Sequence, residues 1–295
     1  MGAVALETLL GELIDYAGLF PPAALSMSDA VSNHAQYISG PERRMLGRFI
    51  VPLARLDELA AAVAGLGARR PSASRPWRVA VIAGAADAAT LRAFVARHGG
   101  TLVVDTIEAK AESPEQIPAI AAALGAHYTV YVEVPVRSDP TPFLSALAVV
   151  GLRAKIRTGG VTADAFPAPA EVMRFLAACV EMGVPFKATA GLHHPLRGEY
   201  RLTYAADAPH GTMYGFMNIF LTAAMLRAGH PAAAIAPLLE ERDAASLVVA
   251  PSGLTWRGFT VTTAQLAAAR TVLAASFGSC SFAEPVEDLH SLRLL

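Results

Sequence analysis

Residues 152–160 read LRAKIRTGG, and in this run Arg153, Lys155 and Arg157 alternate with small or apolar side chains before two glycines end the pattern. Successive side chains of a β-strand point to opposite faces, so the three cations share one face of a strand whose other face is apolar. A strand with one charged and one apolar face indicates a sheet whose two sides meet different surroundings.

Comparable apolar runs recur along the chain, each followed by a turn and a longer Ala/Leu-rich segment with helical spacing. This alternation predicts parallel strands joined by crossover helices. The first run ends YAGLFPPA and lacks the glycine-rich phosphate turn of open doubly wound sheets, which favours a TIM (β/α)8 barrel. The strands expected are 13–20, 48–53, 77–84, 101–109, 128–135, 152–160 and 184–191, with AASFGSCSF (274–282) closing the barrel.

The long interval between the seventh and eighth expected strands, about 192–260, contains helix-like segments that are too apolar to be solvated on every side. We therefore interpret it as an insertion within one βα unit. The expected organisation is a single α/β barrel domain over residues 1–295 with an elaborated segment between strands seven and eight.

Composition points to small-molecule partners. The 295 residues are 54% hydrophobic and carry a formal net charge of −1, and the cations are scattered, which argues against nucleic acid or an anionic membrane surface as a partner. Without a bilayer-spanning apolar run or a secretory leader, the chain is expected to be cytoplasmic. No cofactor is implied, and a homo-oligomer remains possible.

Strand alternation also predicts which polar side chains enter the barrel. Two lysines on adjacent strands, facing the same way, would depress the pKa of one amine through repulsion between like charges. A neutral amine of this kind can attack a carbonyl group and form a Schiff base. The residues expected in the lumen are Asp15, Asp105, Glu133, Lys155, Arg157 and Lys187.

Six motifs, in the same order along the chain, resemble those of the deoxyribose-phosphate aldolases, which are class I aldolases on a TIM barrel. The motifs are LIDYAGLFPPA, VVDTIEA, YTVYVEVP, AKIRTGG, PFKATAGL and SFGSCSF. The resemblance implies Lys155 as the Schiff-base lysine, Lys187 as the amine that lowers its pKa, Asp105 as the proton relay and Asp15 as its support. It also implies a phosphate held by backbone turns at Gly159, Gly160, Gly191 and Ser279.

The chain departs from this family at several of these positions. Ile156 and Arg157 follow the first lysine where the family has small hydroxyl residues, and Cys280 replaces a serine in the closing turn. An inward Arg157 suits a carboxylate by bidentate pairing. We therefore expect a carbon–carbon lyase acting on a small carbonyl substrate with an anionic end, such as a keto acid or acidic aldehyde, contacted by Arg157, Glu133 and His193.

Two other readings remain open. His193, His194 and His210, together with Glu133, raise the possibility of a metal-dependent hydrolase or lyase, although neighbouring histidines on one strand would point to opposite faces. The second alternative is a barrel that binds an anionic metabolite without turnover. Of the two cysteines, Cys179 falls on an apolar helical stripe, whereas a nucleophilic Cys280 would need a nearby base.

Overall fold

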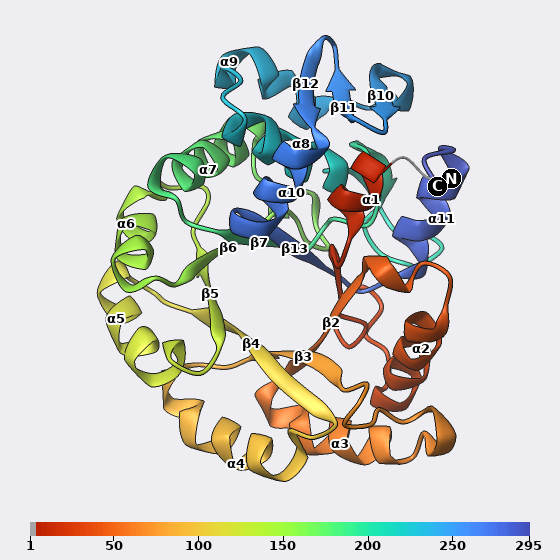
Figure 1. Ribbon diagram of the computed structural model, residues 1–295, viewed down its shortest axis with the longest axis vertical. Helices are drawn as coiled ribbons and strands as arrows, with labels where there is room; N and C mark the ends of the chain where they lie inside the picture. The colour runs from red at the N-terminus through yellow and green to blue at the C-terminus, as the bar shows by residue number, and fades with distance from the viewer. Residues whose placement is uncertain (1–3) are drawn as a thin grey trace.

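In the computed structural model, which describes residues 4–295, eight parallel strands close into a barrel (Figure 1). The strand order around the barrel is β1-β13-β7-β6-β5-β4-β3-β2, so the C-terminal strand pairs with the first, as the sequence predicts. The TIM-barrel prediction is confirmed. The strands are β1 (Ile14–Tyr16), β2 (Leu46–Pro52), β3 (Trp77–Ile82), β4 (Leu102–Lys110), β5 (Thr129–Val134), β6 (Arg153–Arg157), β7 (Phe186–Thr189) and β13 (Ala274–Ser279).

Helices surround the strands. They are α1 (Val4–Leu10), α2 (Met27–Ser39), α3 (Leu56–Ala64), α4 (Ala88–His98), α5 (Ile117–Ile120), α6 (Thr141–Val150), α7 (Pro169–Met182), α8 (Phe216–Arg227), α9 (Ala232–Ile235), α10 (Thr263–Val272) and α11 (Ala283–Ser291). Figure 1 shows α2 to α7 as a ring outside the barrel. Among the helices within residues 4–295, none combines the length and the apolar character needed to cross a membrane.

Glycines occupy matching positions before β6 and β7. The helices α6 and α7 end at Gly151 and Gly183, whose left-handed φ angles of 71° and 64° side chains other than glycine adopt at a cost. Lys155 follows Gly151 by four residues, and Lys187 follows Gly183 by four residues. In the register of the β6–β7 pair, which sets Ala154 opposite Phe186, Lys155 and Lys187 are direct partners.

The strand β4 contains an irregularity that regular alternation does not predict. Val104 pairs with Val79 of β3, but the next pair is Thr106 with Ala80, so Asp105 has no partner on that strand. An extra residue of this kind reverses the faces of the side chains that follow it. The alternation expected from the sequence therefore fails after Asp105, and Glu108 faces the lumen where unbroken alternation would place Ile107.

The chain between β7 and β13 contributes a hairpin, a buried helix and a small sheet. The hairpin consists of β8 (Gly198–Arg201) and β9 (His210–Met213), and β10 (Leu247–Ala250), β11 (Gly253–Trp256) and β12 (Phe259–Thr262) form a three-stranded antiparallel sheet. This sheet lies outside the helical ring in Figure 1. The helix α8 packs against the barrel through Phe216 and Phe220, whose rings contact Phe277 of β13.

A buried carboxylate anchors the three-stranded sheet to its preceding loop. Glu241 accepts hydrogen bonds from the backbone amides of Arg242 and Asp243, from the Trp256 indole at 2.9 Å and from the Arg257 guanidinium at 2.9 Å. Burial opposes ionisation, but these donors outweigh it and lower the pKa of Glu241 to about 2. The carboxylate is thus ionised in the folded protein.

We expect Glu241→Gln to lower the free energy of unfolding by on the order of 2 kcal/mol at neutral pH, because an amide cannot accept from all of these donors. Because the pKa of Glu241 is lower in the folded protein than the ordinary 4.5, its ionised carboxylate contributes its full stabilisation at pH values above 4.5. This contribution disappears as the pH falls toward 2. Urea unfolding between pH 7 and pH 3 should therefore show the two proteins converging. The exposed neighbour Glu240→Gln is the control, and a pH-independent difference would contradict this account.

Candidate active site

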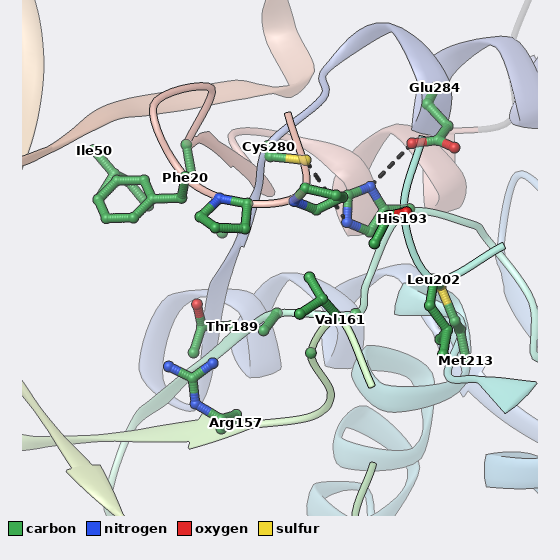
Figure 2. A pocket seen from close by; sticks show the side chains of 18 of the residues that line it. Phe20, Ile50, Arg157, Val161, Thr189, His193, Leu202, Met213, Cys280 and Glu284 are labelled. Atoms are coloured by element: carbon green, nitrogen blue, oxygen red, sulfur yellow. Dashed lines mark hydrogen bonds and ion pairs between the residues drawn. The ribbon is translucent and has the colours of Figure 1, made fainter. Parts of the chain in front are cut away.

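A cavity of about 420 Å³ opens at the C-terminal ends of the barrel strands. This is the end at which TIM-barrel enzymes place their active sites, and the volume suits a small molecule. The inner part of the cavity is lined by Glu108, Glu133 and Lys155, and residues 201–204 of the β8–β9 hairpin line its outer wall. Figure 2 shows Arg157 and Thr189 on one side of the cavity and Cys280, His193 and Glu284 on the other.

Lysine is confined to this region of the protein. The chain has 24 Lys and Arg residues, and only three are lysines, Lys110, Lys155 and Lys187, on β4, β6 and β7. Lys110 and Lys155 line the cavity, whereas Lys187 is fully buried. Apart from the exposed Lys110 at the cavity, the surface cations of this chain are arginines, and the scarcity of lysine is a sequence signal that points to the barrel.

Lys155 reaches the cavity between two carboxylates. Its Nζ lies 3.0 Å from Glu133 Oε2 and 3.2 Å from Glu108 Oε2, and its side chain is almost completely buried. Arg157 is two residues further along the same strand, and its Nε lies 3.6 Å from Glu133 Oε1. With 49% of its side chain exposed, Arg157 keeps donors free for a ligand.

Lys187 lies deeper and joins two other carboxylates. Its Nζ donates to Asp15 at 2.7 Å and to Glu108 at 2.5 Å. Burial lowers the pKa of Lys187, but the two carboxylates outweigh burial and hold this pKa above its ordinary value. Burial likewise raises the pKa values of Asp15 and Glu108, and the charge of Lys187 brings both below their ordinary range. All three groups are therefore ionised at neutral pH.

Asp15 belongs to this buried network through two further hydrogen bonds. It accepts from the Ser276 hydroxyl of β13 at 2.7 Å and from the backbone amide of Arg48 at 2.7 Å. Gly47 provides the space for the carboxylate, since a Cβ atom at this position would lie 2.2 Å from Asp15 Oδ1. Asp15 thus connects β1, β2, β7 and β13, as a support beneath the cavity rather than on its wall.

Asp105 does not join the lysines, which corrects its expected role as the proton relay. It lies toward the N-terminal end of the barrel, where it accepts from Arg48 Nη2 at 3.0 Å and from Arg78 Nε at 2.9 Å. The irregularity in β4 explains the error, because it places Glu108 where uninterrupted alternation would place an apolar side chain. The sequence feature that indicates an inward Glu108 is the run TIEAK (106–110), in which the polar residues are at 106, 108 and 110.

The glycines expected to hold a phosphate have a packing role in this structure. A Cβ atom on Gly159 would lie 2.4 Å from the Phe166 ring, and one on Gly191, where φ is +72°, would lie 2.7 Å from the same ring. Gly160 and Gly191 line the cavity, but Gly159 and Ser279 are not among its lining residues. Gly278 of β13 and Cys280, which directly follows this strand, line the cavity instead.

A second group of polar side chains lies on the cavity wall away from Arg157. The Cys280 sulfur is 3.9 Å from His193 Nε2, and His193 Nδ1 is 3.0 Å from Glu284 Oε2 (Figure 2). His194 pairs with α11 through its own contact, Nδ1 to Asp288 at 2.6 Å. His193 thus bridges a thiol and a carboxylate that are both far from it along the chain, so no local spacing indicates these contacts.

The histidines do not converge on a metal site. Within residues 4–295, no three or more His, Cys, Asp and Glu side chains form a group that could hold a metal ion. His193 and His194 lie in the loop after β7, where their Nδ1 atoms face separate carboxylates of α11, and His210 begins β9 as an exposed residue.

No protein-family model matches the chain, and no curated protein sequence matches it either. The chemistry available to this site is therefore inferred from its own side chains. On one part of the cavity wall these are a lysine amine, flanking carboxylates and an arginine, and on another part a thiol beside a histidine.

We expect Lys187→Met to lower the free energy of unfolding by about 3–5 kcal/mol, because it leaves Asp15 and Glu108 buried without their cation. Lys110→Met is the matched control, since the exposed Lys110 side chain should change stability by about 0.5 kcal/mol or less. Urea unfolding at pH 7 measures both. Equal destabilisation by the two substitutions would contradict the network described for Lys187.

Proposed function

We propose that this protein is a class I carbon–carbon lyase that forms a Schiff base between Lys155 and a small carbonyl substrate. The observation that carries the proposal is the placement of Lys155, a lysine in a chain with only three, at the inner end of a cavity between two carboxylates. A buried amine beside groups that accept and return protons is what imine formation requires.

Proton transfer in this proposal belongs to Glu133 and Glu108. Burial raises the pKa of Glu133, but Lys155 and Arg157 outweigh burial and lower it, so the carboxylate is ionised and can act as a base. It takes a proton from the Lys155 ammonium, and the freed amine attacks the substrate carbonyl carbon. The resulting carbinolamine loses water, with the returned proton, to give the iminium ion.

The iminium ion then accepts the electron pair of the bond that breaks. A carboxylate removes the proton from the substrate's β-hydroxyl group, the carbon–carbon bond cleaves, and an aldehyde leaves while an enamine remains on Lys155. Protonation of the enamine carbon and addition of water to the imine release the second carbonyl product. The reverse sequence forms the carbon–carbon bond, and the geometry favours neither direction.

The cavity suits a substrate with an anionic end. Arg157 and Arg201 line it together with Lys110, and their guanidinium and ammonium groups recognise a carboxylate or phosphate. Phe20, Ile50 and Met213 provide apolar surface between these charges. The proposed substrates are therefore short keto acids and aldehydes that carry a carboxylate or a phosphate.

The resemblance to the deoxyribose-phosphate aldolases supports this proposal through the two lysines on adjacent strands. It needs one change of role, because Glu108, and not Asp105, is the β4 carboxylate beside the lysines. The Phe166 ring packed on Gly159 and Gly191 also differs from an open phosphate turn. We therefore propose that Arg157, and not a glycine turn, binds the anionic end of the substrate.

The direct test is borohydride reduction in the presence of a panel of short keto acids and aldehydes. We expect a reduced adduct on the peptide that contains Lys155, with Lys110 and Lys187 in the same digest as internal controls, and no adduct on that site in Lys155→Met. An absence of adducts across the panel, with ligand-induced thermal stabilisation, would favour a binding protein. If a chelator abolishes turnover and Lys155→Met leaves it unchanged, the result would favour a metal-dependent enzyme.

A pair of β4 substitutions separates the two candidate carboxylates. Glu108→Gln should slow adduct formation on Lys155 by on the order of 100-fold, because it removes a proton-transfer group beside the amine. Asp105→Asn should leave the rate within about threefold, because Asp105 contacts only Arg48, Arg78 and Thr106 among the hydrogen bonds of its side chain. A larger loss in Asp105→Asn than in Glu108→Gln would restore Asp105 as the relay.

A further inference from the structure

Two segments far apart in the sequence, the loop after β7 and residues 280–284, bring a thiol, an imidazole and a carboxylate together beside the cavity. Cys280 directly follows β13, His193 lies in the loop after β7, and Glu284 is in the first turn of α11. Cys280 and His193 are buried, at 5% and 7% exposure, yet all three residues line the cavity. The sulfur is therefore accessible to a ligand and shielded from bulk solvent.

The contacts between the three groups follow the order nucleophile, base and orienting acid. Cys280 Sγ is 3.9 Å from His193 Nε2, and the opposite ring nitrogen of His193 is 3.0 Å from Glu284 Oε2. Figure 2 shows these contacts in a row along one wall. A carboxylate on the far nitrogen fixes the imidazole's orientation and supports its positive charge, as in nucleophilic triads generally.

The positive charge on His193 supports the assignment of Cys280 as the nucleophile of this group. Burial lowers the pKa of His193, but contacts with Cys280 and Glu284 outweigh burial and raise it to about 9. The ring is thus an imidazolium at neutral pH, with an N–H toward each partner. Tyr204 completes the group by donating to Glu284 Oε2 at 3.0 Å, and its hydroxyl is 3.7 Å from the Cys280 sulfur.

The other cysteine shows what an unreactive thiol looks like in the same protein. Cys179 is fully buried within α7, and burial raises the pKa of its thiol above the ordinary range. It cannot act as a resolving thiol for Cys280 without leaving the core. Because the chain has no third cysteine, disulfide exchange within the protein does not account for the Cys280 arrangement.

We propose that Cys280, His193 and Glu284 form a nucleophilic thiol site that accepts an acyl group from an ester or thioester bound in this cavity. The reacting form is an ion pair in which the proton of the Cys280 thiol is held by His193. The thiolate attacks the acyl carbonyl carbon, a carbon–sulfur bond forms, and the bond to the leaving alcohol or thiol breaks. The imidazolium gives its Nε2 proton to the leaving group. Neutral His193 then removes a proton from water, whose oxygen attacks the thioester, releases the acid and regenerates the Cys280 thiolate beside the His193 imidazolium.

This activity is independent of imine formation at Lys155, since it uses another nucleophile and another part of the wall. The probe is p-nitrophenyl acetate, which reports acyl transfer through the release of nitrophenol. We expect a rapid phase of release, an acetyl adduct on the Cys280 peptide by mass spectrometry and slower continued turnover. Cys280→Ala should remove the rapid phase and that adduct, whereas Cys179→Ala should leave both unchanged.

The role of the histidine is tested separately from the accessibility of the thiol. His193→Gln should slow acetylation of Cys280 by on the order of 100-fold, and Glu284→Gln should slow it by about tenfold or more. Thermal unfolding shows whether each variant is folded. If His193→Gln is not folded, the acetylation rate of Glu284→Gln is compared with that of the wild type instead. A folded variant that acetylates Cys280 at the wild-type rate, or a wild-type protein whose Cys280 is not acetylated, would overturn the proposal.

Discussion

The salt bridges from Lys187 to Asp15 and Glu108 determine the interior of this barrel. They join β7 to β1 and β4 across the lumen, where unpaired charges would be too costly to bury. Glu108 also accepts a hydrogen bond from Lys155 at 3.2 Å, so the same contacts that hold the deeper lysine set the position of the lysine that faces the cavity. Structure and proposed chemistry thus share one set of side chains.

The network divides the barrel interior into levels with different roles. Near the N-terminal ends of the strands, Arg48 and Arg78 pair with Asp105, and Arg153 donates to the Tyr131 hydroxyl at 3.1 Å. The lysine and carboxylate level follows, and the cavity opens beyond it at the level of Arg157. Charges at the first level stabilise the barrel, while only those at the cavity are available to a substrate.

Much of this arrangement could be predicted from sequence because it depends on local periodicity. The alternation in β6 and β7 places Lys155 and Lys187 inward, and each lysine follows a helix-ending glycine by four residues, in keeping with their direct pairing. The irregularity at Asp105 could not be predicted from alternation, since one unpaired residue reverses the pattern after it. The contact between His193 and Glu284 spans 91 residues and depends on the folded positions of a loop and a helix.

Because the chain contains only three lysines, spectroscopy can test directly whether Lys155 is the residue that forms the imine. Protein labelled with ¹⁵N at the lysine Nζ atoms should give few side-chain signals, and adding a short keto acid or aldehyde that the cavity accepts should move one signal into the imine region. We expect this signal to be the one missing from Lys155→Met. If all three remain amine or ammonium signals across the panel, or if the imine forms at Lys110 or Lys187, Lys155 is not the nucleophile.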